Sequence, residues 1–355
     1  MNSSSFAYKL KVFKIKLNSW EYWPMSVVYF PASLYFIYLS IRAKSFFFFS
    51  AANPSIQTGG MFFESKWDIF KLIPDKYYPT TFLISPSNTI EDINEKIEQH
   101  DIHYPFIAKP DRGERGWAVK IINNETELRN YHSNMGITYL IQKLVSFPLE
   151  YSVFYYRHPS AQKGRITSIT RKEYLSVTGD GKSTIFQLIK ENDRAFLQLE
   201  KLQKIGSINF NKILALKEKF VLSPFGNHVR GSMFLDETHI ANAELTDTFD
   251  TISKQINGFY FGRFDLKCNS QQDLQKGENI MIVELNGAGA EAAHIYQPNY
   301  SFFKAQKVIM QHLKMMFKVG VENNRNGAAY MTYKEYKKTK KEEYQYKSKV
   351  SLLCL

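Results

Sequence analysis

The chain has 355 residues, of which 44% are hydrophobic and 23% charged, a balance typical of a folded globular protein rather than a disordered one. Its two cysteines, Cys268 and Cys354, are too few for a disulfide framework or a zinc site, which favours a reducing, cytoplasmic setting. The net charge of +12 would suit nucleic acid, but segments 9–21 and 334–349 supply much of it, with eleven lysines against four glutamates. Neither has the aromatic-interleaved pattern of an RNA-binding sheet, so we expect no nucleic-acid partner.

The N-terminal segment 20–49 is dense in aromatic residues, and the run from Val27 to Ile41 has no charged residue. These fifteen residues are too short for a spanning helix, Pro31 interrupts them, and no signal-peptide cleavage site follows. Two interpretations stay open. The helix either lies in the interface of an anionic membrane, which the basic arm before it favours, or packs internally on the protein core. The protein is thus expected in the cytoplasm, alone or peripherally bound at the inner face of the membrane.

Further along the chain, residues 45–50 are predicted to form a buried strand, followed by a loop with Asn53. This asparagine contacts a substrate or simply holds an Asn-Pro turn, and the turn is favoured. After residue 320 the chain becomes polar and lysine-rich, which predicts a solvated helix or a disordered tail. Apolar spacing predicts helices at residues 89–101, from 125 onward, at 185–203 and at 302–317.

Two strands near the C-terminal end carry the strongest chemical signal. They are predicted at 262–265 and 282–287, with a polar loop at 269–279 between them. If they pair as a hairpin, alternation aims Asp265, Glu284 and Asn286 at one point. Two carboxylates and an amide oxygen, with Arg263 nearby, suit Mg²⁺ carrying nucleotide phosphates. The alternative is a surface hairpin with ordinary acidic residues.

Three other segments precede this pair of strands in a set order. Lys66 stands before a helical run that ends at Pro74, and Lys109 ends an apolar strand. A glycine-containing loop, 111–117, follows, and then an apolar strand at 139–145. This order resembles the ATP-grasp superfamily, in its D-alanine–D-alanine ligase-like and carboxylate–amine ligase branch. The similarity runs from about residue 60 to about residue 313.

The resemblance implies an α/β fold, with α+β subdomains, in which ATP lies between two sheet-containing subdomains after a short N-terminal region. It divides the chain into a basic and aromatic N-terminal segment, an N-terminal subdomain with its preceding strand and loop, a C-terminal catalytic subdomain and a lysine-rich tail. The expected boundaries are 1–50, 51–135, 136–320 and 321–355.

The resemblance also implies roles for single residues. Asp265, Glu284 and Asn286 would hold Mg²⁺ or Mn²⁺, and Arg263 would steady the transferred phosphate. Lys66 and Lys109 would contact the phosphates, beneath a closing loop that carries Arg112 and Gly113. The remaining ATP contacts are implied along the hinge strand and just after it: Gln142, Lys143, Leu144, Val145 and Glu150.

At the substrate end, the family's glycine turn matches Gly287-Ala288-Gly289, which lacks the Ser-Pro-Gly of D-alanine ligases and so argues against D-alanine. Glu291 and His294 follow it as candidate contacts for the amine or the carboxylate. Arg230 is expected at the catalytic centre and His228 beside the substrate. The segment Gly179-Asp180-Gly181 resembles an insert of peptide-forming ligases such as cyanophycin synthetase.

The sequence therefore indicates an ATP-dependent carboxylate–amine ligase with small-molecule substrates that acts through an acylphosphate. Similar ligases are commonly dimers, which leaves a homodimer open. The alternative is a membrane-associated ATP-binding protein that uses another acceptor or lacks catalysis. A P-loop NTPase is disfavoured, because Ser176 stands where the first glycine of a Walker loop ending at Gly181-Lys182-Ser183 should be.

Overall fold

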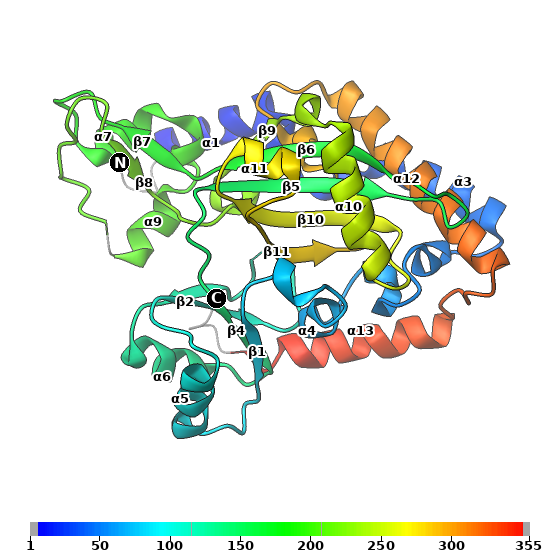
Figure 1. Ribbon diagram of the computed structural model, residues 1–355. Helices are drawn as coiled ribbons and strands as arrows, with labels where there is room; N and C mark the ends of the chain where they lie inside the picture. The colour runs from blue at the N-terminus through cyan, green and yellow to red at the C-terminus, as the bar shows by residue number, and fades with distance from the viewer. Residues whose placement is uncertain (1–5, 115, 207, 351–355) are drawn as a thin grey trace.

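The computed structural model describes residues 6–114, 116–206 and 208–350 (Figure 1). These residues form a four-stranded sheet of order β1-β4-β2-β3, a five-stranded sheet of order β11-β10-β5-β6-β9 and a two-stranded β7-β8 sheet. Neighbouring strands in all three sheets run antiparallel. Helices pack on the two larger sheets, so the mixed α/β architecture with two sheet-containing subdomains agrees with the fold class expected from the motifs.

The four-stranded sheet contains β1 (Thr81–Ile84), β2 (Phe106–Pro110), β3 (Lys120–Ile122) and β4 (Tyr139–Lys143). Two helices pack against it, α5 (Ile90–Gln99) and α6 (Glu125–Asn134). Each begins at a side-chain cap, Thr89 for α5 and Asn124 for α6, which satisfies an amide of the first turn. Both helices were predicted from the apolar spacing and are confirmed.

The five-stranded sheet contains β5 (Leu149–Tyr156), β6 (Arg165–Glu173), β9 (Met233–Asp236), β10 (Phe261–Cys268) and β11 (Ile280–Asn286). One face is covered by α10 (Ala243–Gln255), which crosses in front of the strands in Figure 1, and by α11 (Gln271–Lys276). The other face packs at one end against α12 (Phe302–Arg325) and lines a pocket at the other end.

Alternation along β10 separates its two faces. Phe264, Leu266 and Cys268 are fully buried in the core beneath α10, so Arg263 and Asp265 point to the opposite face. A single strand thus supports the hydrophobic core and presents charged side chains to the pocket. Cys354 lies outside the described residues.

A smaller unit is built on β7 (Ser176–Thr178) and β8 (Lys219–Val221), with three short helices: α7 (Ile185–Glu191), α8 (Asp193–Phe196) and α9 (Leu199–Ile205). The N-terminal helix α1 (Phe6–Asn18) packs on this unit, with the rings of Tyr8 and Phe196 5.0 Å apart. The chain then passes through α2 (Met25–Val28) to α3 (Phe30–Ala43), which lies along α12.

The C-terminal helix α13 (Tyr333–Lys347) runs from the end of α12 back to the four-stranded sheet (Figure 1). There the hydroxyl of Tyr346 donates a hydrogen bond of 2.9 Å to the carbonyl oxygen of Thr138. The described part of the lysine-rich tail is therefore a docked helix. None of the helices within the described ranges is both long enough and apolar enough to cross a bilayer.

Three predicted elements are wrong. Residues 45–50 do not form a strand but lead into a 3₁₀ helix, η2 (Phe48–Ala52), whose phenylalanines pack on α12. The small residues of η2 and Gly320 of α12 allow this close helical contact. The predicted helix over 185–203 is divided into α7, α8 and α9. The first break falls at Asn192, which leaves the helical conformation and caps α8 instead. The polar loop 269–279 contains α11, which Ser270 caps.

Asn53 has the structural role that the sequence favoured. Its side chain is fully buried and makes four hydrogen bonds of 2.8–3.0 Å with backbone groups of residues 59, 260 and 261. It therefore ties the loop before α4 (Lys66–Phe70) to the start of β10.

Candidate functional site

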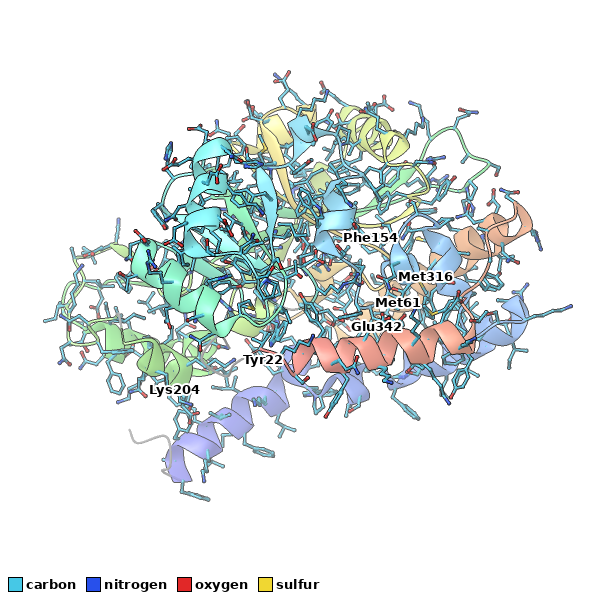
Figure 2. The ribbon with its side chains drawn as sticks, turned by 90° about the horizontal axis from the view of Figure 1, so that it is seen from below. Tyr22, Met61, Phe154, Lys204, Met316 and Glu342 are labelled. Atoms are coloured by element: carbon cyan, nitrogen blue, oxygen red, sulfur yellow. The ribbon has the colours of Figure 1, made fainter. Side chains whose placement is uncertain are left out.

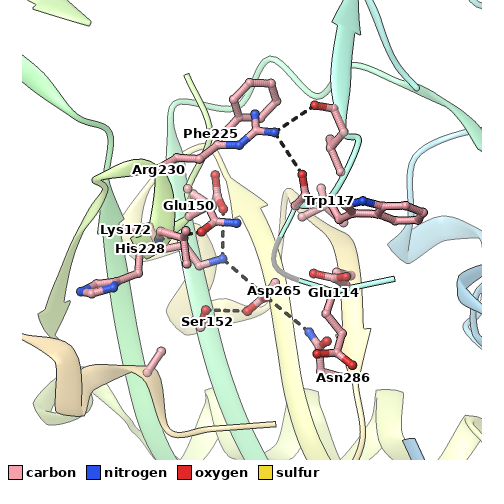
Figure 3. A pocket seen from close by; sticks show the side chains of 18 of the residues that line it. Glu114, Trp117, Glu150, Ser152, Lys172, Phe225, His228, Arg230, Asp265 and Asn286 are labelled. Carbon is pink, nitrogen blue, oxygen red and sulfur yellow. Dashed lines mark hydrogen bonds and ion pairs between the residues drawn. The ribbon is translucent and has the colours of Figure 1, made fainter. Parts of the chain in front are cut away.

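A pocket of about 780 Å³ lies between the four-stranded and five-stranded sheets, and side chains of both line it. This volume falls within the range of about 300–1,000 Å³ usual for small-molecule sites. Figure 3 shows Glu150, Lys172 and Asp265 together on neighbouring strands of the five-stranded sheet, with Arg230 and Trp117 across the pocket.

The β10–β11 pairing brings the strongest predicted residues together. Arg263 stands opposite Asn286, and Asp265 stands opposite Glu284. Because paired residues of an antiparallel sheet point to the same face, all four side chains face the pocket. The hairpin predicted from the sequence is confirmed as a strand pair.

Asp265 is the most enclosed of these side chains. Arg263 donates two hydrogen bonds to it, from Nε to Oδ1 at 2.8 Å and from Nη2 to Oδ2 at 3.0 Å. Ser152 also donates to Oδ1, at 2.5 Å. Burial alone would raise the pKa of Asp265, but the positive charges of Arg263 and Lys172 outweigh it and hold that pKa well below its usual value. The carboxylate therefore stays ionised across the physiological range.

Lys172 of β6 is a central residue that the sequence interpretation missed. Its buried ammonium lies 3.1 Å from Glu150 Oε1 and 3.5 Å from Asp265 Oδ2. Burial would lower the pKa of Lys172, but the two carboxylates raise it, so the lysine stays charged. Glu150, expected among the ATP contacts, is thus held by Lys172 and by the hydroxyl of Tyr174, which donates to Oε2 at 3.0 Å.

The opposite wall carries the two lysines implied by the resemblance. Lys66 Nζ lies 3.8 Å from Glu284 Oε1 and donates to the carbonyl oxygen of Gly113. Lys109 is buried and donates to Gln142 Oε1 at 2.9 Å and to the carbonyl oxygen of Val283 at 3.0 Å. Burial lowers the pKa of Lys109 to about 7, so its charge depends on what occupies the pocket.

Strand β4 and the residues after it were implied as ATP contacts, and their arrangement differs from that expectation. Gln142 was expected as an ATP contact, but both ends of its side-chain amide are engaged. Lys109 donates to its Oε1, and its Nε2 donates to the Thr81 hydroxyl at 2.9 Å. Leu144 and Val145 line the pocket. Lys143 lines it too, although its ammonium turns to Asp101, 3.5 Å from Oδ2.

The predicted closing loop is braced from two sides. Arg112 Nη1 donates to Gln57 Oε1 at 2.7 Å and to the carbonyl oxygen of Phe63. Arg230 Nη2 donates to the carbonyl oxygens of residues 116 and 119, at 3.0 and 3.3 Å (Figure 3). Arg230 was expected at the catalytic centre. Its hydrogen bonds are instead made with this loop, and not in the neighbourhood of Arg263. Arg115 lies outside the described residues.

The N-terminal segment contributes to the wall of the pocket, which the sequence did not indicate. Glu291 accepts hydrogen bonds from the hydroxyls of Tyr29 and Tyr296. His228 Nε2 lies 2.7 Å from Glu21 Oε2, and both residues line the pocket. Two of the substrate candidates, Glu291 and His228, thus face the pocket. Each makes a hydrogen bond with a residue that comes before residue 30.

Other substrate candidates are engaged within the protein. His294 is buried away from the pocket, 2.7 Å from the Ser168 hydroxyl, and burial lowers its pKa. The turn from Gly287 to Gly289 packs against the glycine pair at 59–60, whose carbonyl oxygens accept the amides of residues 288 and 289 at 2.9 and 2.8 Å. Those two amides are not available to an oxyanion in this arrangement.

The Walker-like segment does not form a phosphate loop. The Asp180 carboxylate accepts hydrogen bonds from the backbone amides of Lys182 and Ser183, at 3.0 and 2.7 Å. These are amides that a P-loop would present to phosphate. The geometry therefore disfavours the P-loop alternative.

A hard cation fits the donor chemistry of the β10–β11 face. Asp265, Glu284 and Asn286 offer carboxylate and amide oxygens, which suit Mg²⁺ or Mn²⁺ when phosphate and water complete the shell. Glu284 and Asn286 are only half-buried, whereas Asp265 shares its oxygens with Arg263. In the described part of the chain, no group of three or more His, Cys, Asp or Glu side chains could hold a metal ion by itself.

The structure matches solved ligases of the ATP-grasp superfamily at low sequence identity. D-alanine–D-alanine ligase from Bacillus anthracis is matched with a TM-score of 0.45 and 12% identity, over 76% of this chain and 70% of that one. The same enzyme complexed with ATP is matched with a TM-score of 0.43 and 13% identity, over 74% and 68%.

A bifunctional glutathione synthetase from Pasteurella multocida is matched with a TM-score of 0.39 and 13% identity, over 71% of this chain and 35% of that one. This chain therefore spans about a third of the synthetase's length. No protein-family model and no curated protein sequence matches the chain. The activity proposed below is argued from the geometry of the site.

Proposed function

We propose that this protein is an ATP-dependent carboxylate–amine ligase that forms an amide bond through an acylphosphate. One observation carries the proposal. The paired Asp265 and Glu284 face a pocket between two sheets, and Lys66 and Lys109 enter that pocket from the opposite wall. Oxygen donors and lysines that line one pocket of this size suit a metal-bound polyphosphate.

The cations of the pocket would offset part of the charge of a triphosphate. Lys66 and Lys109 lie on one wall, and Lys172 lies on the other beside Asp265. Their positive charge, in an enclosed site, offsets the repulsion between phosphate groups and carboxylates. A divalent cation held by Glu284, Asn286 and Asp265 would supply further charge neutralisation at the phosphate oxygens.

Arg263 is the residue best placed beside the reacting groups. Its guanidinium is held by Asp265 and by the carbonyl oxygen of Glu291, to which Nη1 donates at 3.1 Å. In the proposed reaction, a carboxylate oxygen attacks the γ-phosphorus of ATP and ADP leaves. The amine then attacks the acylphosphate carbon, inorganic phosphate leaves, and the amine loses a proton. Arg263 would stabilise negative charge on the transferred group in both steps, because guanidinium is always protonated.

Of the loop at 111–117, residues 112–114, 116 and 117 line the pocket. Arg230 and Lys66 hold its carbonyl oxygens from opposite sides of the pocket. Covering the phosphates in this way would keep water from hydrolysing the acylphosphate before the amine arrives.

The decisive experiment measures ADP formation with Mg²⁺ across a panel of amino acids and small carboxylates, each with and without an added amine. Turnover that needs both a carboxylate and an amine is expected. Asp265→Asn and Glu284→Gln should reduce it by about 10²-fold or more. Glu278→Gln, an exposed glutamate between the same two strands, is the matched control and should leave it unchanged.

Other results would replace the proposal. Tight MgATP binding with no turnover on any substrate would favour the non-catalytic alternative. A phosphorylated or thioester product that forms without an amine would favour a different acceptor.

A further inference from the structure

The first helix, α1, exposes a continuous apolar stripe. Four residues at helical spacing, Phe6, Leu10, Phe13 and Leu17, are 40–81% exposed. The opposite side of α1 buries Tyr8 against Phe196. Helix α1 is thus packed on the protein through its other face, so the exposed stripe belongs to a firmly attached helix.

Helix α3 repeats this arrangement. Its exposed stripe consists of Phe30, Leu34, Ile37 and Ile41, which are 48–72% exposed. The buried side includes Leu39, which packs in the same cluster as residues of α12. Two interpretations of this segment stayed open, internal packing and a membrane interface. The first describes the buried face of α3, and the second concerns its exposed face.

The two helices that carry these stripes lie on one side of the molecule. Both helices follow the lower edge of Figure 2, which is the far side in Figure 1. Two further exposed side chains belong to elements next to them, Val27 of α2 and Phe303 at the start of α12. We call these ten residues the N-terminal apolar surface. Exposed apolar groupings of this kind are unusual in a monomer and mark an interaction site.

The N-terminal segment itself is one-sided in charge, with Asp193 of α8 as an acidic neighbour 3.7 Å from Lys11. Residues 1–50 contain six basic residues and a single acidic one, Glu21. Glu21 is turned inward, 2.7 Å from an Arg194 nitrogen and from His228 Nε2. Lys9, Lys14, Arg42 and Lys44 are exposed. The helices therefore present apolar and positively charged side chains to solvent and no exposed acidic side chain.

We propose that the N-terminal apolar surface docks on an anionic membrane surface. Amphipathic helices with lysines beside their apolar face lie in the plane of the bilayer interface, where the apolar stripe enters the acyl boundary. The lysines then reach the phosphate groups, and each contributes about fivefold to binding of anionic lipid. A second copy of this chain is a poorer partner, because its matching surface would bring like charges together.

Docking would also orient the pocket. Tyr22, Trp23 and Met25 lie between the two stripes in the chain and line the pocket, as does Lys16 at the end of α1. That edge of the pocket would therefore lie beside the lipid headgroups. The docking proposal itself does not depend on the ligase activity.

The test is flotation of the full chain with vesicles of equal parts phosphatidylglycerol and phosphatidylcholine, and with vesicles of phosphatidylcholine alone. We expect binding to the anionic vesicles that weakens at high salt. Ile41→Glu and Phe13→Glu should each weaken it at least tenfold, and Lys9→Glu with Lys14→Glu should weaken it on anionic vesicles. Leu216→Glu is the matched control, because Leu216 is 70% exposed in the loop before β8 and Ile41 is 72% exposed.

Outcomes of two kinds would overturn the proposal. The first is no flotation of the wild-type chain, or equal loss in Leu216→Glu and Ile41→Glu. The second is a dimer in light scattering that Ile41→Glu dissociates while vesicles are not bound, which would assign the surface to a second copy. Since these readouts need no turnover, they succeed or fail independently of the ligase assay.

Discussion

Nucleotide binding should be coupled to protonation of Lys109. In the free protein, burial lowers the pKa of Lys109 to about 7. At pH 8, about one tenth of the molecules then carry this charge, and if bound phosphate restores an ordinary lysine pKa, binding takes up about 0.9 proton. The sign follows from the lowered pKa, because the complex holds more protons than the free protein above pH 7. Affinity for MgATP should therefore fall about fiftyfold between pH 7 and pH 9, as the protonated fraction falls from about one half to about one hundredth.

Calorimetric titration of MgATP at pH 8, in two buffers of different ionisation enthalpy, measures the proton uptake directly. Lys109→Met should bind more weakly at pH 7 and lose both the uptake and the pH dependence. Lys143→Met is the control, because this lysine also lines the pocket but its ammonium is turned to Asp101. Wild-type affinity that is constant from pH 7 to pH 9, or unchanged proton uptake in Lys109→Met, would refute the reasoning.

Three further changes test other parts of the structure. Arg263→Lys should lower kcat by about 10²–10³ because an ammonium cannot reproduce the two-pronged contact with Asp265; an unchanged kcat at saturating substrate would contradict this. Asn53→Ala should lower the free energy of unfolding in urea by about 3–5 kcal/mol, since four hydrogen bonds to backbone groups are lost in the core. Tyr29→Phe removes a donor to Glu291, and the KM of one substrate should rise severalfold with little change in kcat, whereas a purely structural tyrosine would leave KM unaltered.

Features governed by local sequence were predictable. Alternation along β10 and β11 was sufficient to place Asp265, Glu284 and Asn286 on one face, because side chains of a strand alternate with a period of two. The helices α5 and α6 followed from apolar spacing, and their caps mark where each begins. The prediction of one helix over 185–203 was wrong at Asn192, whose side chain competes for backbone amides. Apolar spacing contains no information about that competition.

Only the tertiary structure decided which groups hold the site together. Lys172 reaches Glu150 and Asp265 because β5 stands between β6 and β10, and no local pattern specifies that strand order. Likewise, the hydrogen bond between Tyr29 and Glu291 joins residues 262 positions apart. The amino-acid sequence by itself thus determined which faces carry charge, through periods of two and 3.6 residues. Which charges meet was decided by packing between distant segments, because burial and pairing act on positions in space rather than on neighbours in the chain.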